Sequence, residues 1–135
     1  MTPSEILKKY NLSKTLCRIR ILDTFIKSQK ALSQHDIQQQ ILSGCDRSTI
    51  FRIINKFNEL HILYKIDVAN TQKYFFNSPS VFYNKKNRDL VFFHCSKCDK
   101  TVPLQDIFIP DYLVPDGFIK HYNNFVIEGL CDECR

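Results

Sequence analysis

The sequence predicts an α+β fold in two parts, and three observations carry this prediction. Residues 16–60 hold apolar residues at helical spacing, whereas residues 63–76 are rich in β-branched and aromatic residues. Two cysteine hooks, Cys95-x2-Cys98 and Cys131-x2-Cys134, follow with 32 residues between them. The 135 residues, of which 44% are hydrophobic, suffice for two small packed domains and exclude a disordered chain.

The first predicted helix carries an apolar stripe at a spacing close to 3.6 residues: Leu16, Ile19, Leu22 and Ile26. Ser13, just before the stripe, is its predicted N-cap.

A short second helix is expected from about Gln34 to Leu42, capped by Ser33. Its inward face consists of Ile37, Ile41 and Leu42. The pair Ser43-Gly44 ends it, since glycine commonly follows the last helical residue.

The next predicted helix begins after Asp46, a good N-cap, and runs to about Leu60. One face is apolar: Ile50, Ile53, Ile54, Phe57 and Leu60. The opposite face collects Ser48, Phe51, Arg52, Asn55 and Glu59. Two helices joined by a short glycine-containing turn, the second with a basic and amide-bearing outer face, predict a helix-turn-helix.

Two β-rich runs, Leu63–Val68 and Lys73–Phe76, flank residues 69–72 and predict a hairpin. A helix-turn-helix followed by a hairpin is a winged helix, and Lys65 and Lys73 would then be available to phosphates.

Charge divides the chain in the same way. Residues 1–88 hold 15 Lys and Arg against 6 Asp and Glu, a balance of +9, whereas residues 89–135 hold 4 against 8, a balance of −4. A basic half of this kind is expected to meet a polyanion. No apolar run reaches the roughly 18 residues of a membrane helix, and the N-terminus lacks a signal-peptide core, so we expect a cytoplasmic protein without a membrane segment.

A polar, turn-rich stretch from residue 78 to residue 88 predicts a domain boundary. We expect a winged-helix domain at residues 1–80, a linker at 81–89 and a second domain at 90–135. In the second domain, strands at Val91–His94 and Phe125–Ile127 would deliver the two hooks. Prolines at 103, 110 and 115 leave room between them only for loops or a short helix.

The two hooks can offer four thiolates to one tetrahedral ion, which predicts one structural Zn²⁺ per chain held by Cys95, Cys98, Cys131 and Cys134. Cys17 and Cys45 stand alone in the sequence and are expected to be small apolar residues, buried or half-buried. A site with four cysteines leaves no open coordination position, and no catalytic motif is recognisable elsewhere, so we do not expect an enzyme.

Four motifs in order resemble the ferric uptake regulator family of bacterial metalloregulators, from about Leu12 to Cys134. The run Thr15 to Leu22 is similar to that family's Thr-x-x-Arg-x-x-Ile-Leu opening. The run Leu32 to Ile37 is similar to the start of its second helix. Ser48 to Arg52 resembles its recognition-helix Ala-Thr-Val-Tyr-Arg, and the paired hooks resemble its zinc site. The resemblance implies a homodimer, with the C-terminal α/β domain serving as the dimerisation domain. It also implies a double-stranded promoter inverted repeat as the DNA partner and repression as the usual action.

The residues expected to contact DNA lie on the recognition helix and at the start of the first motif: Lys14, Arg18, Ser48, Thr49, Phe51, Arg52 and Asn55. Arg52 could bind guanine or a phosphate, and Ser48 and Thr49 could donate to phosphate oxygens. Phe51 replaces the family's tyrosine and keeps a ring for a thymine methyl group. Asn55 could bind adenine or the backbone.

The sequence departs from the resemblance at the ligands of the regulatory metal. Apolar residues stand where the family places histidines and carboxylates: Ala31, Phe75, Leu90, Val91, Phe92 and Leu130. Because apolar side chains cannot ligate Fe²⁺, Zn²⁺ or Mn²⁺, we expect a regulator that has lost ordinary metal sensing. It would bind DNA constitutively or respond to oxidation of the zinc thiolates.

Two alternatives stay open. The first is a metal-dependent sensor that uses unconventional ligands, such as His94 and His121 with Asp89 or Asp111 nearby. The second is a zinc-ribbon adaptor that binds RNA or protein, although the chain shows no stacking surface of Arg and aromatic residues.

Overall fold

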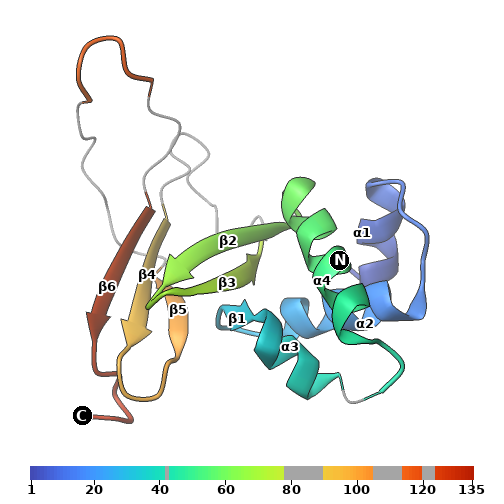
Figure 1. Cartoon of the computed structure of the whole chain (residues 1–135), viewed down its shortest axis with the longest axis horizontal. Coiled ribbons are helices and arrows are strands. Elements are labelled where there is room, and N and C mark those ends of the chain that lie inside the picture. Colours follow the sequence, from blue (N-terminus) through green and yellow to red (C-terminus); the bar gives the residue numbers. More distant parts are fainter. Residues whose placement is uncertain (42, 78–89, 105–113, 120–123) are drawn as a thin grey trace. The chain divides into compact units, whose positions relative to one another are not determined.

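The computed structural model describes residues 1–41, 43–77, 90–104, 114–119 and 124–135 (Figure 1). The chain divides into two compact units, Met1–Asn77 and Ser78–Arg135. The expected domain boundary at residue 80 and the linker at 81–89 lie outside the described residues. Every helix in the described part is too short or too polar to cross a bilayer.

The described residues of the N-terminal unit form four helices and three strands in the order α1, α2, β1, α3, α4, β2, β3. Their bounds are α1 Pro3–Lys9, α2 Leu16–Lys27, β1 Leu32–Ser33, α3 Gln34–Gln40, α4 Arg47–Glu59, β2 Leu63–Val68 and β3 Thr71–Phe76. The predicted helices and hairpin are all present. Helix α1 was not among the predicted helices, although a capping box between Thr2 and Glu5, with Pro3 in the first turn, marks its start.

Side-chain caps set where the helices begin. Thr15 caps α2, because its hydroxyl accepts the Arg18 amide at 3.3 Å. The prediction of Ser13 as the cap is wrong, since Ser13 accepts the Arg18 guanidinium instead. Ser33 caps α3 in a capping box with Asp36, as a short Ser-x-x-Asp run permits. The helix ends at Gln40, and Leu42 lies outside the described residues.

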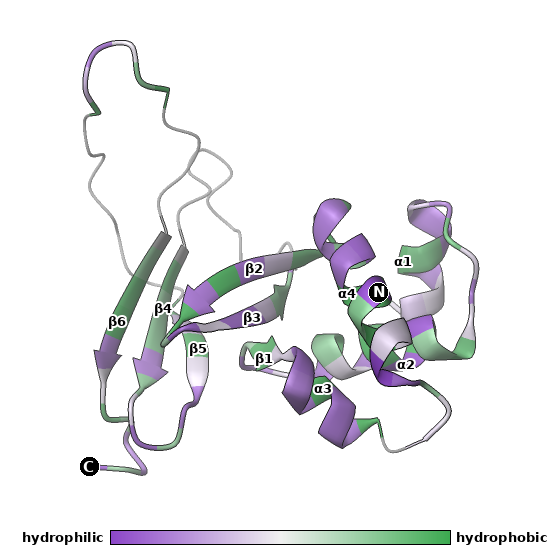
Figure 2. Cartoon of the chain, in the orientation of Figure 1, coloured by the Kyte–Doolittle hydropathy of each residue, from purple (hydrophilic) through white to green (hydrophobic). Residues whose placement is uncertain are grey.

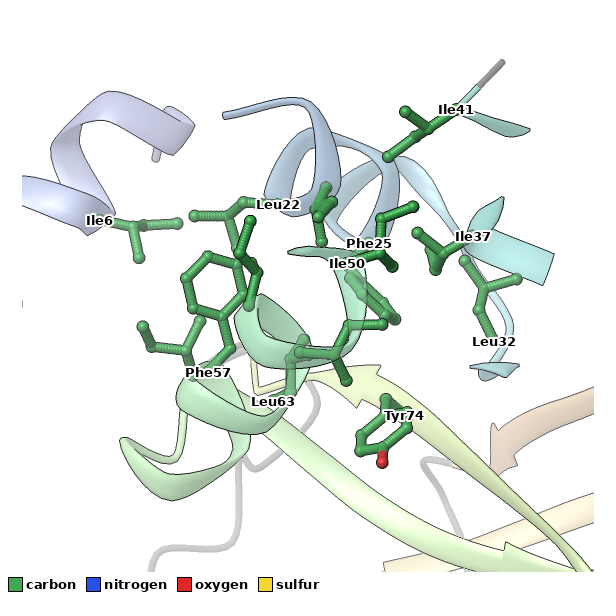
Figure 3. Packing of buried hydrophobic residues seen from close by; sticks show 14 of the residues in the cluster. Ile6, Leu22, Phe25, Leu32, Ile37, Ile41, Ile50, Phe57, Leu63 and Tyr74 are labelled. Carbon is green, nitrogen blue, oxygen red and sulfur yellow. The ribbon is translucent and has the colours of Figure 1, made fainter. Parts of the chain in front are cut away.

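The hydrophobic core of this unit forms where the helices meet the hairpin (Figure 3). It joins residues from every helix and strand of the unit, among them Ile6, Leu22, Phe25, Leu32, Ile37, Ile50, Phe57, Leu63 and Tyr74. The apolar face predicted for α4 is confirmed, since Ile50, Ile53, Ile54 and Phe57 are buried. The stripe predicted for α2 is partly wrong. Leu16, the first helical residue, is 65% exposed, and Ile21 and Phe25 are buried instead.

The small sheet has the order β1-β3-β2, with both pairs antiparallel. Ala69 and Asn70 join β2 to β3 with φ of 49° and 62°, as a two-residue hairpin turn with positive φ at both positions requires. The prediction that Lys73 reaches phosphates is contradicted, since it is only 3% exposed. Its strand, β3, lies between β1 and β2, and Lys73 itself is paired with Ser33 of β1 and Ile66 of β2. Lys65 is exposed.

The C-terminal unit holds a sheet of the order β5-β4-β6. The strands are β4 (Leu90–Cys95), β5 (Thr101–Leu104) and β6 (Asn124–Gly129). Strand β4 pairs parallel with β6 and antiparallel with β5. The expectation of loops or a short helix around Pro103 is wrong, because Pro103 lies within β5. Proline is tolerated there because β5 has one neighbour in the described sheet and can spare an amide on its other side.

Candidate metal centre and nucleic-acid interface

Parallel strands bring the two cysteine hooks to one end of the C-terminal sheet. Cys95 is opposite Gly129 in the register of β4 and β6, and Cys131 follows two residues later. One sulfur atom from each of Cys95, Cys98, Cys131 and Cys134 lies within 4.8 Å of the other three. The Sγ atoms of Cys98 and Cys131 are 3.8 Å apart. Zinc with tetrahedral Zn–S bonds of about 2.3 Å separates its sulfurs by about 3.8 Å, so the four thiols fit the ion predicted for them.

Backbone amides favour a thiolate in this cluster. The Cys98 and Cys131 amides donate to Cys95 Sγ at 3.5 and 3.4 Å, and these hydrogen bonds lower the pKa of Cys95 to about 6. The neighbouring Cys131 side chain has the opposite effect on Cys134 and raises its pKa to about 12. The cluster thus favours ionisation of one cysteine, Cys95, and disfavours ionisation of another, Cys134, as expected of four crowded thiols. A divalent cation would remove that opposition.

Short backbone contacts hold the hooks in shape. The Cys95 amide donates to Lys100 O at 2.8 Å, and the Asp99 amide donates to Cys95 O at 3.0 Å. Asp99 adopts a positive φ of 66°, which closes the turn. The Ser96 amide reaches Gly129 O at 2.9 Å and so ties the first hook to the strand that carries the second. The backbone therefore holds the first hook in a closed turn next to the end of β6.

His94 is buried beside this cluster with both ring nitrogens in polar contacts. Nδ1 lies 2.9 Å from Thr101 Oγ1 and Nε2 lies 3.4 Å from Asp99 Oδ1. Its proposed metal-binding partners, His121, Asp89 and Asp111, fall outside the described residues. Within the described ranges, the four cysteines are the one group of His, Cys, Asp and Glu with metal-binding geometry.

The apolar replacements at the expected sensor site occupy different environments. Ala31, Phe75, Val91 and Phe92 are buried, whereas Leu130 is half exposed. The Leu90 side chain lies outside the described residues.

The outer face of α4 presents most of the predicted DNA contacts to solvent. Ser48, Phe51 and Arg52 are exposed, and Phe51, an aromatic residue, is 52% exposed. Asn55 and Thr49 are partly exposed. Hydrophilic and hydrophobic residues alternate along the helix, as a helix with one buried face requires (Figure 2). Phe51 is thus a large apolar side chain left in solvent on the same helix face that exposes Ser48.

The two predicted phosphate donors are engaged locally in this structure. The Thr49 amide donates to Asp46 Oδ1 at 2.7 Å and Ser48 Oγ donates to the same atom at 3.2 Å. Hydrogen bonds from the Thr49 side chain and amide, and from Ser48, hold the pKa of Asp46 below its ordinary value. The first turn of α4 is therefore capped by a carboxylate.

Lys14 and Arg18 lie where α2 begins. Lys14 is exposed and Arg18 is partly buried by its contacts with Ser13.

A disulfide that the sequence does not predict joins the start of α2 to the segment just before α4. Cys17 and Cys45 are bonded, with Cα atoms 5.8 Å apart and a sequence separation of 28. The expectation of two isolated apolar residues is therefore wrong, although both are half-buried and pack against the core. Only the folded chain shows the pairing, because nothing in the spacing of two single cysteines indicates that they meet.

Comparison with known proteins decides the family. A sequence model of the Ferric uptake regulator family matches residues 9–112. The chain belongs to this family. The ferric uptake regulation protein of Staphylococcus epidermidis is 25% identical over 137 residues, which cover 97% of this chain and 92% of that protein.

Solved structures show the same fold. The ferric uptake regulator of Vibrio cholerae superposes with a TM-score of 0.66 at 13% identity, covering 95% of this chain and 98% of that one. A zinc uptake regulator in complex with zinc and DNA gives a TM-score of 0.62 at 16% identity, covering 96% and 88%. This likeness confirms the predicted α+β fold. Members of the ferric uptake regulator family are DNA-binding transcription regulators and not enzymes, which confirms the predicted functional class.

Proposed function

We propose that this chain is a promoter-binding repressor that reads a DNA inverted repeat as a homodimer and keeps one structural zinc per chain. Such a role places it in the cytoplasm. The observation that carries the proposal is the exposed face of α4, where Ser48, Phe51 and Arg52 share a surface opposite a buried apolar face. The basic balance of +9 in residues 1–88 supports attraction to a phosphate backbone.

Each side chain of this surface has a role in the proposal. Arg52 donates to a guanine edge or a phosphate, Phe51 packs on a thymine methyl group, and Asn55 pairs with adenine or the backbone. Ser48 and Thr49 exchange their bonds with Asp46 for bonds to phosphate. Lys14 and Arg18, at the start of α2, contact the adjacent backbone or minor groove.

A homodimer is supported by the C-terminal sheet. Strand β6 leaves Phe125 and Ile127 exposed, and Leu130 follows them on the same segment. Exposed apolar side chains along a strand with one neighbour in the described sheet suit burial against a second copy. A two-fold protein would also match the two-fold symmetry of an inverted repeat.

Loss of ordinary metal sensing is the finer part of the proposal. The buried apolar residues Ala31, Phe75 and Phe92 support it, because none of them can replace a nitrogen or oxygen ligand. DNA affinity should then be the same with and without added Fe²⁺, Mn²⁺ or Zn²⁺ in protein that already holds its structural zinc. A large gain in affinity on adding one of these ions would favour the unconventional sensor instead.

The test begins with a duplex selected by the protein from a randomised pool. Arg52→Ala should weaken binding to that duplex about 10-fold or more, since a good base contact contributes roughly 1–3 kcal/mol. Lys27→Ala is the matched control. It also removes one positive charge from the same unit, but Lys27 lies at the end of α2 in an exposed pair with Asp23. Equal losses in both variants would mean that α4 has no special role.

Sedimentation of the complex tests the homodimer separately. Two chains per duplex are expected, and a single chain bound to each duplex would contradict this part.

A further inference from the structure

We propose that Cys17 and Cys45 form a reversible disulfide that raises DNA affinity by fixing the start of α4 against the start of α2. The inference rests on the proposed DNA-binding function. It adds a redox-controlled site in the N-terminal unit, separate from the four cysteines of the C-terminal unit.

The bond lies between two segments that the proposed function places on DNA. Cys17 is the second residue of α2 and adjoins Arg18. Cys45 directly precedes Asp46, the N-cap of α4. The Cα separation of 5.8 Å lies within the roughly 4.4–6.8 Å that disulfides span, so the fold accommodates the bond at an ordinary backbone distance.

Among the described residues, buried Ile41 anchors the start of the segment between α3 and α4, and the disulfide at Cys45 fixes its end. Ser43 and Gly44 are exposed, and Gly44 has a φ of +87°. A guanidinium nitrogen of Arg20 donates to Ser43 O. Cys17 Sγ lies 3.3 Å from Gly44 O, so the thiol of a reduced Cys17, a weak donor, has a carbonyl acceptor within reach. Both redox states are therefore accommodated, but only the disulfide is a covalent restraint.

The restraint stabilises the N-terminal unit and also fixes the segment that leads into the proposed DNA-binding face of α4. Ile53, Ile54 and Phe57 anchor α4 in the core whether or not the disulfide is present. In the first turn of α4 Ile50 is also buried, whereas Ser48 is exposed on the outer side, and the segment that Cys45 ends leads directly into this turn. Ordering flexible groups on association costs free energy, so a surface fixed in advance binds more tightly.

The chemistry needs a thiol oxidant, and glutathione disulfide is sufficient. The thiolate of one cysteine attacks a glutathione sulfur, which forms a mixed disulfide and releases one glutathione thiolate. The second cysteine, as thiolate, attacks the sulfur of the first, which closes the Cys17–Cys45 bond and releases the second glutathione. Two protein thiols become one disulfide, two electrons pass to the oxidant, and the two protons end on the two glutathione thiols.

The experiment uses the full-length, zinc-loaded protein in buffers that range from pure glutathione to pure glutathione disulfide. Differential alkylation followed by mass spectrometry reports the state of Cys17 and Cys45. Fluorescence anisotropy reports binding to labelled duplexes that the oxidised and the reduced protein select from a randomised pool in separate selections. A colorimetric chelator monitors zinc content in the same samples. The double variant Cys17→Ser, Cys45→Ser is the matched control, because it keeps both hooks.

Oxidised wild type should bind the duplex about 3- to 10-fold more tightly than reduced wild type, with unchanged zinc content. The double variant should show the lower affinity in both buffers. Equal affinities of oxidised and reduced wild type, or tighter binding by the reduced form, would overturn the inference. So would a Cys17–Cys45 pair that stays reduced in glutathione disulfide. A redox response of the same size in the double variant would assign the effect to the zinc thiolates.

Failure of the proposed function is distinguishable from failure of this inference. If neither redox form of wild type selects any duplex, the proposed DNA binding fails, and with it the effect on affinity. If both forms select and bind a duplex equally well, DNA binding stands and the redox control is refuted.

Discussion

Reduction of the Cys17–Cys45 bond should lower the stability of the N-terminal unit by an amount that its position in the chain sets. The bond closes a loop with a sequence separation of 28. Restricting an unfolded chain by a loop of this length stabilises the folded state by roughly 3.5 kcal/mol. That is a large share of the 5–15 kcal/mol typical of a whole domain, so reduction should shift the unfolding transition clearly.

Urea unfolding followed by circular dichroism at 222 nm measures this change. All helices in the described part of the chain belong to the N-terminal unit, so the signal reports mainly on that unit. The wild-type midpoint should fall on addition of a phosphine reductant, whereas the double variant Cys17→Ser, Cys45→Ser should unfold alike with and without it. A wild-type midpoint that does not move, in protein shown by alkylation to be reduced, would refute the loop-closure reasoning.

Three further predictions concern the core, the cap of α4 and the zinc hooks. Phe57→Ala should lower the free energy of unfolding by about 3–5 kcal/mol in the same urea assay, because Phe57 is fully buried, while the exposed Phe51→Ala should change it by no more than about 0.5 kcal/mol. The lowered pKa of Asp46 means that its carboxylate stabilises the fold fully above pH 3.8, the ordinary value, and that this contribution is lost as the pH falls through the lowered pKa. Asp46→Asn should cap α4 without that acid-dependent loss, and acid titrations of the two proteins that coincide would contradict the assignment. Cys98→Ser should bind zinc far more weakly than wild type, which should hold close to one zinc per chain; metal analysis after gel filtration decides this.

Local chemistry carried most of the successful predictions. Asp46 and Ser33 correctly predict where α4 and α3 begin, because a short side chain with an oxygen atom accepts hydrogen bonds from amides that the first turn leaves unpaired. The apolar period of α4 identified its buried face for a similar reason, since 3.6 residues per turn fixes which side chains share a side. The same kind of signal was present for α1 in Thr2 and Glu5, and it was overlooked.

Predictions about residues whose environment depends on an adjacent strand were wrong. Lys73 was expected at an exposed hairpin, but β1 pairs with the free side of its strand and the side chain is buried. Pro103 was expected to prevent a strand, yet β5 needs amides on one side only in the described sheet. In both cases the outcome depends on which strand lies alongside, and the local sequence does not state that.

The amino-acid order alone determined helices α2 to α4, the hairpin, the basic helix face and the two cysteine hooks, because caps, periodicity and Cys-x2-Cys spacing act within a few residues. Folding decided what distant residues do to one another. Parallel pairing of β4 with β6 brings Cys95 near Cys131, and the packing of α2 against the segment before α4 brings Cys17 to Cys45. These long-range contacts between cysteines depend on how whole helices and strands pack, and that packing is a property of the assembled core rather than of any local sequence.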